Sequence, residues 1–410
     1  MKAIKTLLPV LASLIVAEGA FAQTWTQTSA PTNYWSCVAG SADGTKLVAA
    51  IDDGYTGMNN IYTSTNSGTT WMLTSAPTNY SWDAVASSAD GNKLVVAAFS
   101  SVKTGSKGAI FVSTNSGTTW ALTSAATTNY WISVASSADG NKWAAVSDGG
   151  IYTTTNLGAT WTHQTSAPNF GWGSIISSPD GTRLLVQTSA HIYRSTDSGA
   201  TWTPTTLPIP TWLGVSSQPV IASSADGTKL VATFNTDQNF NACPIFISTN
   251  LGTTWSATST LSNHWTCVAS SADGTKFVAA AVNSQNIGPI YTSTNSGATW
   301  TSNTVPNQDW TCVAFSADGN KLVAVSGRYI LGQIFTTSFT PNPSINITRS
   351  SSNLGLSWLV PSTNFVLQQS ADLASWSNVT NLPLLNLTNL QNQVALPPSG
   401  SSGFYRLKTQ

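Results

Sequence analysis

A unit that is repeated seven times along this chain limits the folds that the chain can adopt. Each unit contains the motif Ser-x-Asp-Gly, and successive motifs are 41 to 49 residues apart. A segment that opens with tryptophan precedes each motif, and an apolar run such as Lys46–Ala50 follows it. A segment rich in β-branched and aromatic residues comes next, as in Ile61–Ser64, and a polar turn leads to a short last segment. Each unit therefore predicts four strands joined by turns.

The ends of the repeat indicate how the units are arranged. Several predicted strands are apolar at consecutive positions, which indicates burial on both faces of a sheet, and stacked four-stranded units form a β-propeller. The last unit lacks a fourth strand after Ile334–Thr337, whereas Thr24–Thr28 resembles a fourth strand without predecessors. Pairing the two would remove free sheet edges, which argues against the alternative of an open solenoid. We therefore expect an all-β fold, with a seven-bladed β-propeller over residues 23–340 that is closed by the N-terminal strand.

The first 22 residues have the features of a secretory signal peptide. Lys2 and Lys5 are followed by the apolar run Leu7–Val16 and by the small-residue cleavage site Ala20–Ala22. A buried N-terminal strand is the alternative. The run is too short to span a membrane, and no later apolar run reaches the ~18 residues that a spanning helix needs. We expect a secreted or cell-surface protein without a membrane span.

Charged residues are scarce. They make up 8% of the chain, against about 25% in an average soluble domain, and Glu18 is the only glutamate. The sequence has no basic patch to neutralise phosphates, which argues against nucleic-acid binding. Removal of the first 22 residues would leave no glutamate for an active site.

Three of the four cysteines occupy one repeated position. Cys37, Cys267 and Cys312 each lie two residues after a tryptophan, and the same position holds alanine, serine or glycine in other units. A position filled by small residues of any chemistry indicates a packing constraint, so we expect buried free thiols. A Cys243–Cys267 disulfide is the alternative. No pair has the spacing of zinc ligands, and we expect neither a metal nor another cofactor.

The polar turns that close six of the units resemble the Asp-box, also called the BNR repeat, with the pattern Ser-x-Asp-x-Gly-x-Thr-Trp. Ser195–Trp202 matches this pattern, whereas Ser64–Trp71 and four other copies carry asparagine in place of the aspartate. The chain is thus similar to the sialidase-like propeller superfamily, which includes sialidases, xyloglucan-active hydrolases, sortilin-type receptors and a photosystem II assembly factor. The resemblance implies that these turns are structural hairpins away from the functional face.

The same resemblance indicates which catalytic residues an enzyme of this kind would need. Family sialidases use an arginine triad and a tyrosine–glutamate pair, whereas Arg183 and Arg194 here fall within one unit and the mature chain has no glutamate. We therefore expect no sialidase activity. Xyloglucan-type hydrolases need two carboxylates across a cleft. Asp53 and Asp309, from the adjoining first and last units, are the candidate pair, with solvated loop aspartates as the alternative.

The loops between the second and third strands differ widely among the units, and variable loops on a rigid scaffold are the usual place of recognition. The aromatic segments that lead into each first strand lie at the same end. Aromatic rings beside amides, with almost no charge, suit a neutral polysaccharide. The candidate binding residues are Tyr34, Trp35, Tyr80, Trp82, Tyr130, Trp131, Phe170, Trp172, His264 and Trp265. The alternative is that the tryptophans pack between blades. Calcium in the loop Asp52–Asn60 is a weaker hypothesis than a solvated loop, because the loop lacks EF-hand spacing.

A different pattern begins near Thr340–Pro343. Six short strands separated by Ser, Asn and Pro turns are predicted, at 345–349, 354–360, 364–369, 376–380, 392–396 and 404–408. We expect a small β-sandwich over residues 341–410, with Trp358, Trp376 and Tyr405 in its core. The run Phe365–Ser370 and those around Trp376 and Tyr405 resemble a fibronectin-like C-terminal module of secreted bacterial proteins, which implies a spacer or surface-retention role.

These observations favour a monomeric, non-catalytic binding or scaffold propeller. Its expected partner is a neutral polysaccharide or a cell-surface protein. A glycoside hydrolase with paired aspartates is the alternative, and an assembly or structural factor is a third class.

Overall fold

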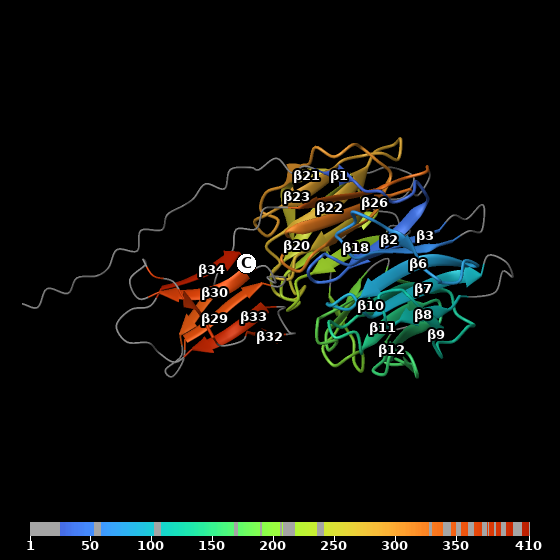
Figure 1. Ribbon diagram of the computed structural model, residues 1–410. Coiled ribbons are helices and arrows are strands. Elements are labelled where there is room, and N and C mark those ends of the chain that lie inside the picture. Colours follow the sequence, from blue (N-terminus) through green and yellow to red (C-terminus); the bar gives the residue numbers. More distant parts are fainter. Residues whose placement is uncertain are drawn as a thin grey trace, which may run out of the picture.

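The computed structural model describes residues 25–52, 59–101, 108–167, 171–188, 191–205, 207, 218–235, 242–327, 330–338, 346–349, 354–359, 365–370, 375, 377–380, 383–386, 391–396 and 404–409. The regular elements of these residues are β-strands, in line with the expected all-β class (Figure 1). No helix able to cross a membrane occurs in this described part of the chain.

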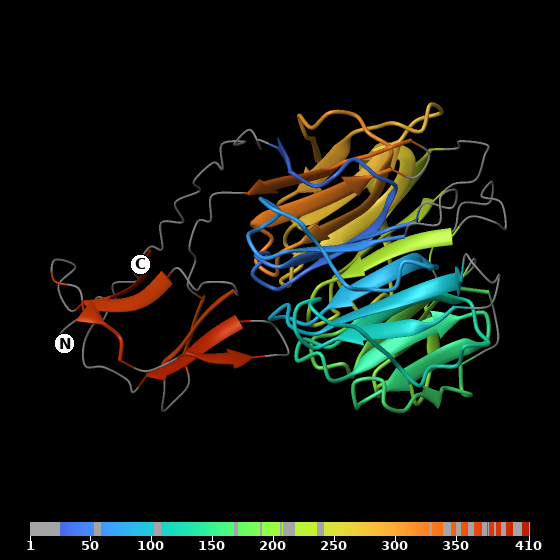
Figure 2. The same ribbon diagram turned by 45° about the vertical axis from the view of Figure 1, so that its right-hand side comes forward.

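The N-terminal part consists of repeated four-stranded antiparallel sheets (Figure 2). The first sheet contains β2 (Trp35–Gly40), β3 (Leu47–Ile51), β4 (Ile61–Ser64) and β5 (Met72–Leu73). The second contains β6 (Tyr80–Ser87), β7 (Leu94–Ser101), β8 (Ile110–Ser113) and β9 (Ala121–Leu122). The third contains β10 (Trp131–Ser136), β11 (Trp143–Ser147), β12 (Gly150–Thr154) and β13 (Thr162–His163). The fourth contains β14 (Trp172–Ser177), β15 (Leu184–Thr188), β16 (Ile192–Ser195) and β17 (Thr203–Thr205).

The next two units share one long strand and form a seven-stranded sheet. Its strands are β18 (Gln218–Ser223), β19 (Leu230–Asn235), β20 (Cys243–Ser248), β21 (Ser256–Ser270), β22 (Phe277–Val282), β23 (Ile290–Ser293) and β24 (Thr301–Ser302). The last sheet contains β25 (Trp310–Phe315), β26 (Lys321–Ser326), β27 (Ile334–Ser338) and the N-terminal β1 (Thr26–Gln27). β1 pairs with β27 through Thr26 and Thr336, as the sequence predicts.

Burial on both faces explains the consecutive apolar residues. All five residues of β3 and of β11 are buried, and the hydrophobic clusters lie between neighbouring sheets. In one of them, Trp82 and Phe111 of the second sheet pack against Val48 and Ala50 of the first. Because each second strand contacts sheets on both sides, alternation of polar and apolar residues is absent. This arrangement is that of a β-propeller.

Backbone hydrogen bonds join successive units at the Ser-x-Asp-Gly motifs. The amide between the serine and the aspartate donates to the carbonyl oxygen of the same position in the next unit, as from Ala42 to Ala89 at 2.8 Å. The equivalent bond from Ala317 of the last sheet to Ala42 of the first is 2.7 Å long. Pro179 occupies this position in the fourth sheet and has no amide proton to donate to Ala225.

The C-terminal residues form two further sheets. One contains β28 (Asn346–Arg349), β29 (Leu354–Leu359), β33 (Gln391–Leu396) and β32 (Leu384–Asn386), and the other contains β31 (Ser377–Asn378), β30 (Phe365–Ser370) and β34 (Phe404–Thr409). Leu367 of the second sheet shares a hydrophobic cluster with Leu356 and Trp358 of the first. Strand β32 was not among the predicted strands, and Trp376 lies outside the described residues.

Candidate functional site

The sheets have two different ends, which we call the turn face and the loop face. The turn face carries the Ser-x-Asp-Gly turns and the closing turns. These two kinds of turn are joined within a unit, since the Ser116 amide donates to the Asn92 carbonyl at 2.8 Å. The loop face carries the connections between second and third strands and the segments that lead into each first strand.

The Ser-x-Asp-Gly turns satisfy their own polar groups. Ser88 donates its hydroxyl hydrogen to Asp90, and its oxygen accepts the Lys93 amide at 3.0 Å. The other Asp90 contacts come from Asn92, through its amide and its side chain. Partial burial opposes ionisation of Asp90, but these hydrogen bonds outweigh it and lower the pKa of the carboxyl group. The same network recurs in the other units, so these aspartates are structural.

A cation follows each of these turns and reaches the next unit. The Lys93 ammonium donates to the Asp139 carbonyl at 2.8 Å, and Lys142 donates to the Asp180 carbonyl at 2.9 Å. The seven cations are Lys46, Lys93, Lys142, Arg183, Lys229, Lys276 and Lys321. Half of the 14 basic residues after residue 22 therefore bond one unit to the next. Much of the scarce positive charge thus has a structural role.

The closing turns repeat a second network. The Ser113 hydroxyl donates to Asn115 at 2.9 Å and accepts the Gly117 amide at 2.9 Å, and Asn115 accepts the Thr119 amide. Gly117 has a φ of 86°, and a Cβ there would lie 2.8 Å from Thr63 of the preceding sheet. Glycine is therefore required both by the backbone conformation and by the close approach of the neighbour.

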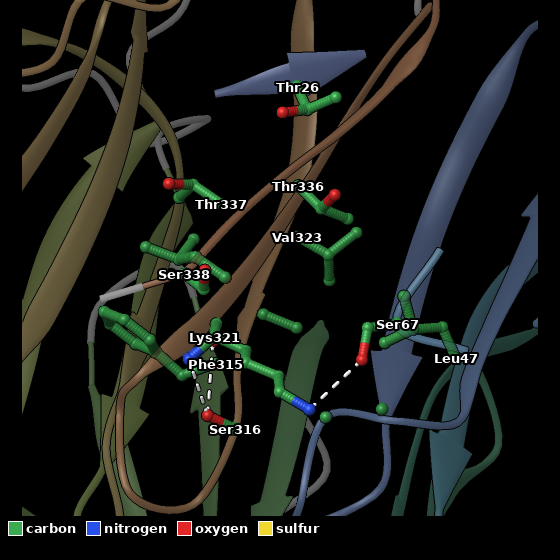
Figure 3. Close-up of a pocket in the computed structure, with 14 residues that line it drawn as sticks. Thr26, Leu47, Ser67, Phe315, Ser316, Lys321, Val323, Thr336, Thr337 and Ser338 are labelled. Atoms are coloured by element: carbon green, nitrogen blue, oxygen red, sulfur yellow. Dashed lines mark hydrogen bonds between the residues drawn. The ribbon is translucent and has the colours of Figure 1, made fainter. Parts of the chain in front are cut away.

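A cavity also lies on the turn face. It has a volume of about 230 Å³ and separates the last sheet from the first (Figure 3). Lys321 crosses it and donates to Ser67 at 3.1 Å, with Leu47 and Thr336 on its walls. Equivalent cavities between other neighbouring sheets measure about 40 and 10 Å³. No residue of the predicted binding surface lines it.

The tryptophans of the predicted binding surface are buried in the structure. Trp35, Trp82, Trp131 and Trp265 are fully buried, and Trp172 is 3% exposed. A ring without exposed surface cannot stack on a sugar. Their indole rings instead pack between strands and sheets. This burial agrees with the alternative interpretation, that a tryptophan present in every unit packs between neighbouring units.

The aromatic residues before the tryptophans fall into different environments. Tyr80 is half-buried against Phe111, with ring centroids 5.3 Å apart, and Tyr34 packs in the cluster between the last and first sheets. His264 is half-buried, and its amide donates to Asn263 at 3.0 Å. Phe170 lies outside the described residues.

Tyr130 is half-buried and forms an aromatic pair with Phe99, which was not among the predicted residues. Its ring stacks on Phe99 with centroids 4.8 Å apart and an interplanar angle of 25°. Phe99 is 40% exposed. Asp148 is exposed beside the Tyr130 backbone: its carboxylate accepts the Tyr130 amide at 2.8 Å, and its own amide donates to the Tyr130 carbonyl. The pair therefore bridges the second and third sheets on the loop face.

A β-bulge explains why Phe99 faces solvent. Trp82 pairs with Ala98 and Ser81 pairs with Ser100, so Phe99 has no partner on β6. Bulges re-aim side chains and are frequent beside functional sites. Strands β6 and β7 have eight residues each, against six and five in β2 and β3, so the second sheet extends further at this end.

The carboxylates of the loop face differ from the predicted pair. Asp53 lies outside the described residues, and Asp309 is only 2% exposed. The structure instead brings Asp52 near Asp83 of β6. Burial, followed by the charge of Asp52, raises the pKa of Asp83 to about 7. Asp52 accepts a hydrogen bond from the Ser81 hydroxyl at 2.7 Å.

The described residues contain no cluster of three or more His, Cys, Asp or Glu side chains that could hold a metal ion. All four cysteines are free, with Cys37 and Cys243 buried. The alternative Cys243–Cys267 disulfide is therefore not formed.

Comparisons with known proteins show the fold. No protein-family model matches the sequence, and no curated protein is similar to it. Among solved structures, the GH74 xyloglucanase from Xanthomonas campestris is 15% identical with a TM-score of 0.59, over 82% of this chain and 59% of the enzyme. YCF48 from Cyanidioschyzon merolae is 15% identical with a TM-score of 0.56, over 78% of this chain and 99% of YCF48. U3-55K is 10% identical with a TM-score of 0.56, over 77% and 98% of the two chains.

Proposed function

We propose that this protein is a non-catalytic binding or scaffold propeller that captures its partner on the loop face. The observation that carries the proposal is the stacked Phe99–Tyr130 pair, which bridges two sheets and in which Phe99 is exposed. Solvent-exposed aromatic rings beside polar groups are typical of recognition surfaces. The opposite face offers little to a partner, because its repeated side chains are already bonded to one another.

The proposal includes an architecture finer than the general fold. We infer seven blades closed by β1, supported by the β1–β27 pairing and by the bond from Ala317 to Ala42. We further infer that the closing turns are Asp-box turns, supported by the recurrent network of Ser113 and Asn115. Together with residues 1–22 as a signal peptide, this gives a secreted or cell-surface protein, in which residues 341–410 serve as a spacer or retention module.

We propose a neutral glycan as the ligand. The apolar face of a sugar ring can stack on Phe99 or Tyr130, while the Asp148 carboxylate accepts hydrogen bonds from the sugar hydroxyl groups. A protein partner is the competing ligand, and one similar fold, YCF48, has been solved bound to the D1 peptide.

A glycan array with the purified protein tests this ligand, followed by titration of the best glycan against Phe99→Ala. We expect a loss of affinity of tenfold or more. Leu122→Ala is the matched control, since Leu122 is also exposed but lies on the outer strand β9. If no neutral glycan binds, the glycan proposal fails. If a protein partner then binds and Phe99→Ala weakens it, the scaffold proposal stands without the glycan.

A second candidate function is a glycoside hydrolase that uses Asp52 and Asp83 in place of the Asp53–Asp309 pair. A general acid needs a raised pKa beside a second carboxylate that stays ionised, and Asp83 with its pKa of about 7 beside Asp52 has this character. Release of reducing sugar from a panel of soluble β-glucans would reveal such an activity. Asp83→Asn should then abolish it, and the fully retained activity of this variant would exclude the pair.

A further inference from the structure

Three thiols lie at one level of three neighbouring first strands. Cys267 of β21 pairs with Ala280, Cys312 of β25 pairs with Val325, and Cys37 of β2 pairs with Ala50, each two residues after a buried tryptophan. The strands belong to successive units, and β21 packs against β25, which packs against β2. The thiols therefore form a row that runs across the junction of the last and first sheets.

The sulfurs of Cys267 and Cys312 each contact the backbone of the next strand as well as the following carbonyl oxygen of their own strand. The Cys267 sulfur accepts the amide of Val313 at 3.4 Å, and Val313 directly follows Cys312. The Cys312 thiol in turn donates to the carbonyl of Val38, which follows Cys37, at 3.8 Å. The side chains of Cys267 and Cys312 also interact with each other, which raises the pKa of Cys267 and lowers that of Cys312.

The two thiols also differ from the other cysteines in surroundings. Cys267 and Cys312 are half-buried, whereas Cys37 and Cys243 are buried. Burial raises the pKa of Cys243 to about 12, and nothing in the described part of the chain places another sulfur beside it. A thiol is oxidised through its thiolate, so Cys312 is the group best suited to react first.

We propose that Cys267 and Cys312 are an oxidisable dithiol that forms a disulfide between neighbouring blades. In the first step, the Cys312 thiolate attacks one sulfur of a disulfide oxidant and displaces a thiolate. In the second, Cys267 loses its proton and attacks the Cys312 sulfur, which releases the other half of the oxidant as a thiol. Two protein thiols are oxidised and one disulfide is reduced to two thiols. The new bond covalently joins β21 to β25, so the protein gains a cross-link beside its closing sheet.

The experiment uses the purified full chain and oxidised glutathione as the disulfide. After incubation, free thiols are counted by alkylation in denaturant, and peptides are mapped without reduction. We expect the number of alkylated cysteines to fall from four to two, with one linked peptide pair that contains Cys267 and Cys312. The midpoint of thermal unfolding should rise by roughly 5 °C or more, because the cross-link restricts the unfolded chain.

Variants separate the proposed pair from other pairings. Cys312→Ser should keep three alkylated cysteines and lose the rise in the unfolding midpoint, and the equivalent position in β10 is already a serine, Ser133, so the variant should fold. Cys243→Ser is the matched control and should still form the disulfide. Four alkylated cysteines after treatment of the folded wild type, or a linked peptide that contains Cys37 or Cys243, would overturn the proposal.

Discussion

The turn face and the loop face are built from the same repeated unit, yet they use their side chains differently. On the turn face, the serine of each unit bonds to its aspartate and to a backbone amide, and each cation bonds to the following unit. On the loop face, equivalent positions hold different residues, as with Asp52, Phe99 and Asp148, each of which follows the residue paired with a buried tryptophan. Repetition therefore marks side chains that hold the propeller together, whereas departures from it mark candidates for recognition.

The sharpest test of this comparison uses two consecutive residues, Trp131 and Tyr130. Trp131 is fully buried and repeated, so Trp131→Ala should lower the free energy of unfolding by about 3–5 kcal/mol. Tyr130 is half-buried at the loop face, and Tyr130→Ala should cost about 1 kcal/mol while weakening partner binding. Urea unfolding of both variants measures the difference. Equal costs would mean that repetition does not separate structural from exposed aromatic residues.

The two faces should also respond to pH in opposite directions. The unfolded pKa of an aspartate is about 3.9, and that of Asp83 is raised to about 7 in the folded protein. The folded state therefore binds more protons between these values, so the stability contributed by the protonated carboxyl group is lost as pH rises toward about 7. Asp83→Asn should raise the free energy of unfolding by about 1–3 kcal/mol at pH 8 and change it little at pH 4.

Aspartates of the turn face have the reverse sign. Hydrogen bonds from Thr201 and Ser195 lower the pKa of Asp197 to about 2, so its stabilising contribution is present above pH 4 and lost as pH falls toward 2. Thermal unfolding of Asp197→Asn and Asp83→Asn across pH 3–8 compares the two groups. A parallel pH dependence in both variants would contradict the distinction between the faces.

A smaller effect is expected within one turn. Ser88 is buried, donates to Asp90 and accepts the Lys93 amide. Ser88→Ala removes both bonds and should lower the free energy of unfolding by about 1–2 kcal/mol without changing partner binding. Thr118→Ala, in an exposed part of a closing turn, is the control. Loss of partner binding in Ser88→Ala, with the fold intact, would place recognition on the turn face.

The strand pattern of the sheets could be predicted from the sequence because the repeat supplies seven aligned copies of the same signal. Even the unusual pairing of β1 with β27 followed from counting strands at the two ends. The candidate site could not be predicted as well. Phe99 lies in an apolar run and reads as core, and only the register of Trp82 against Ala98 reveals that it is bulged outward. Likewise, Asp52 and Asp83 belong to different repeated units. Their proximity depends on how the first and second sheets pack together, which the sequence does not reveal.

The smallest effect is expected at Pro179, which interrupts the series of backbone hydrogen bonds between neighbouring units on the turn face. Pro179→Ala would supply the missing amide, and a new bond to Ala225 should contribute about 0.5–1 kcal/mol. The loss of proline stiffness in the unfolded chain offsets this by about 0.4–1 kcal/mol, so the free energy of unfolding should change by less than about 0.5 kcal/mol. Amide hydrogen exchange can detect the new hydrogen bond even when the free energy of unfolding changes little. The amide of residue 179 should be protected as strongly as that of Ala138, which already donates to Pro179 at 2.7 Å. Rapid exchange at residue 179 would mean that the fourth sheet and the seven-stranded sheet do not approach each other as the other neighbours do.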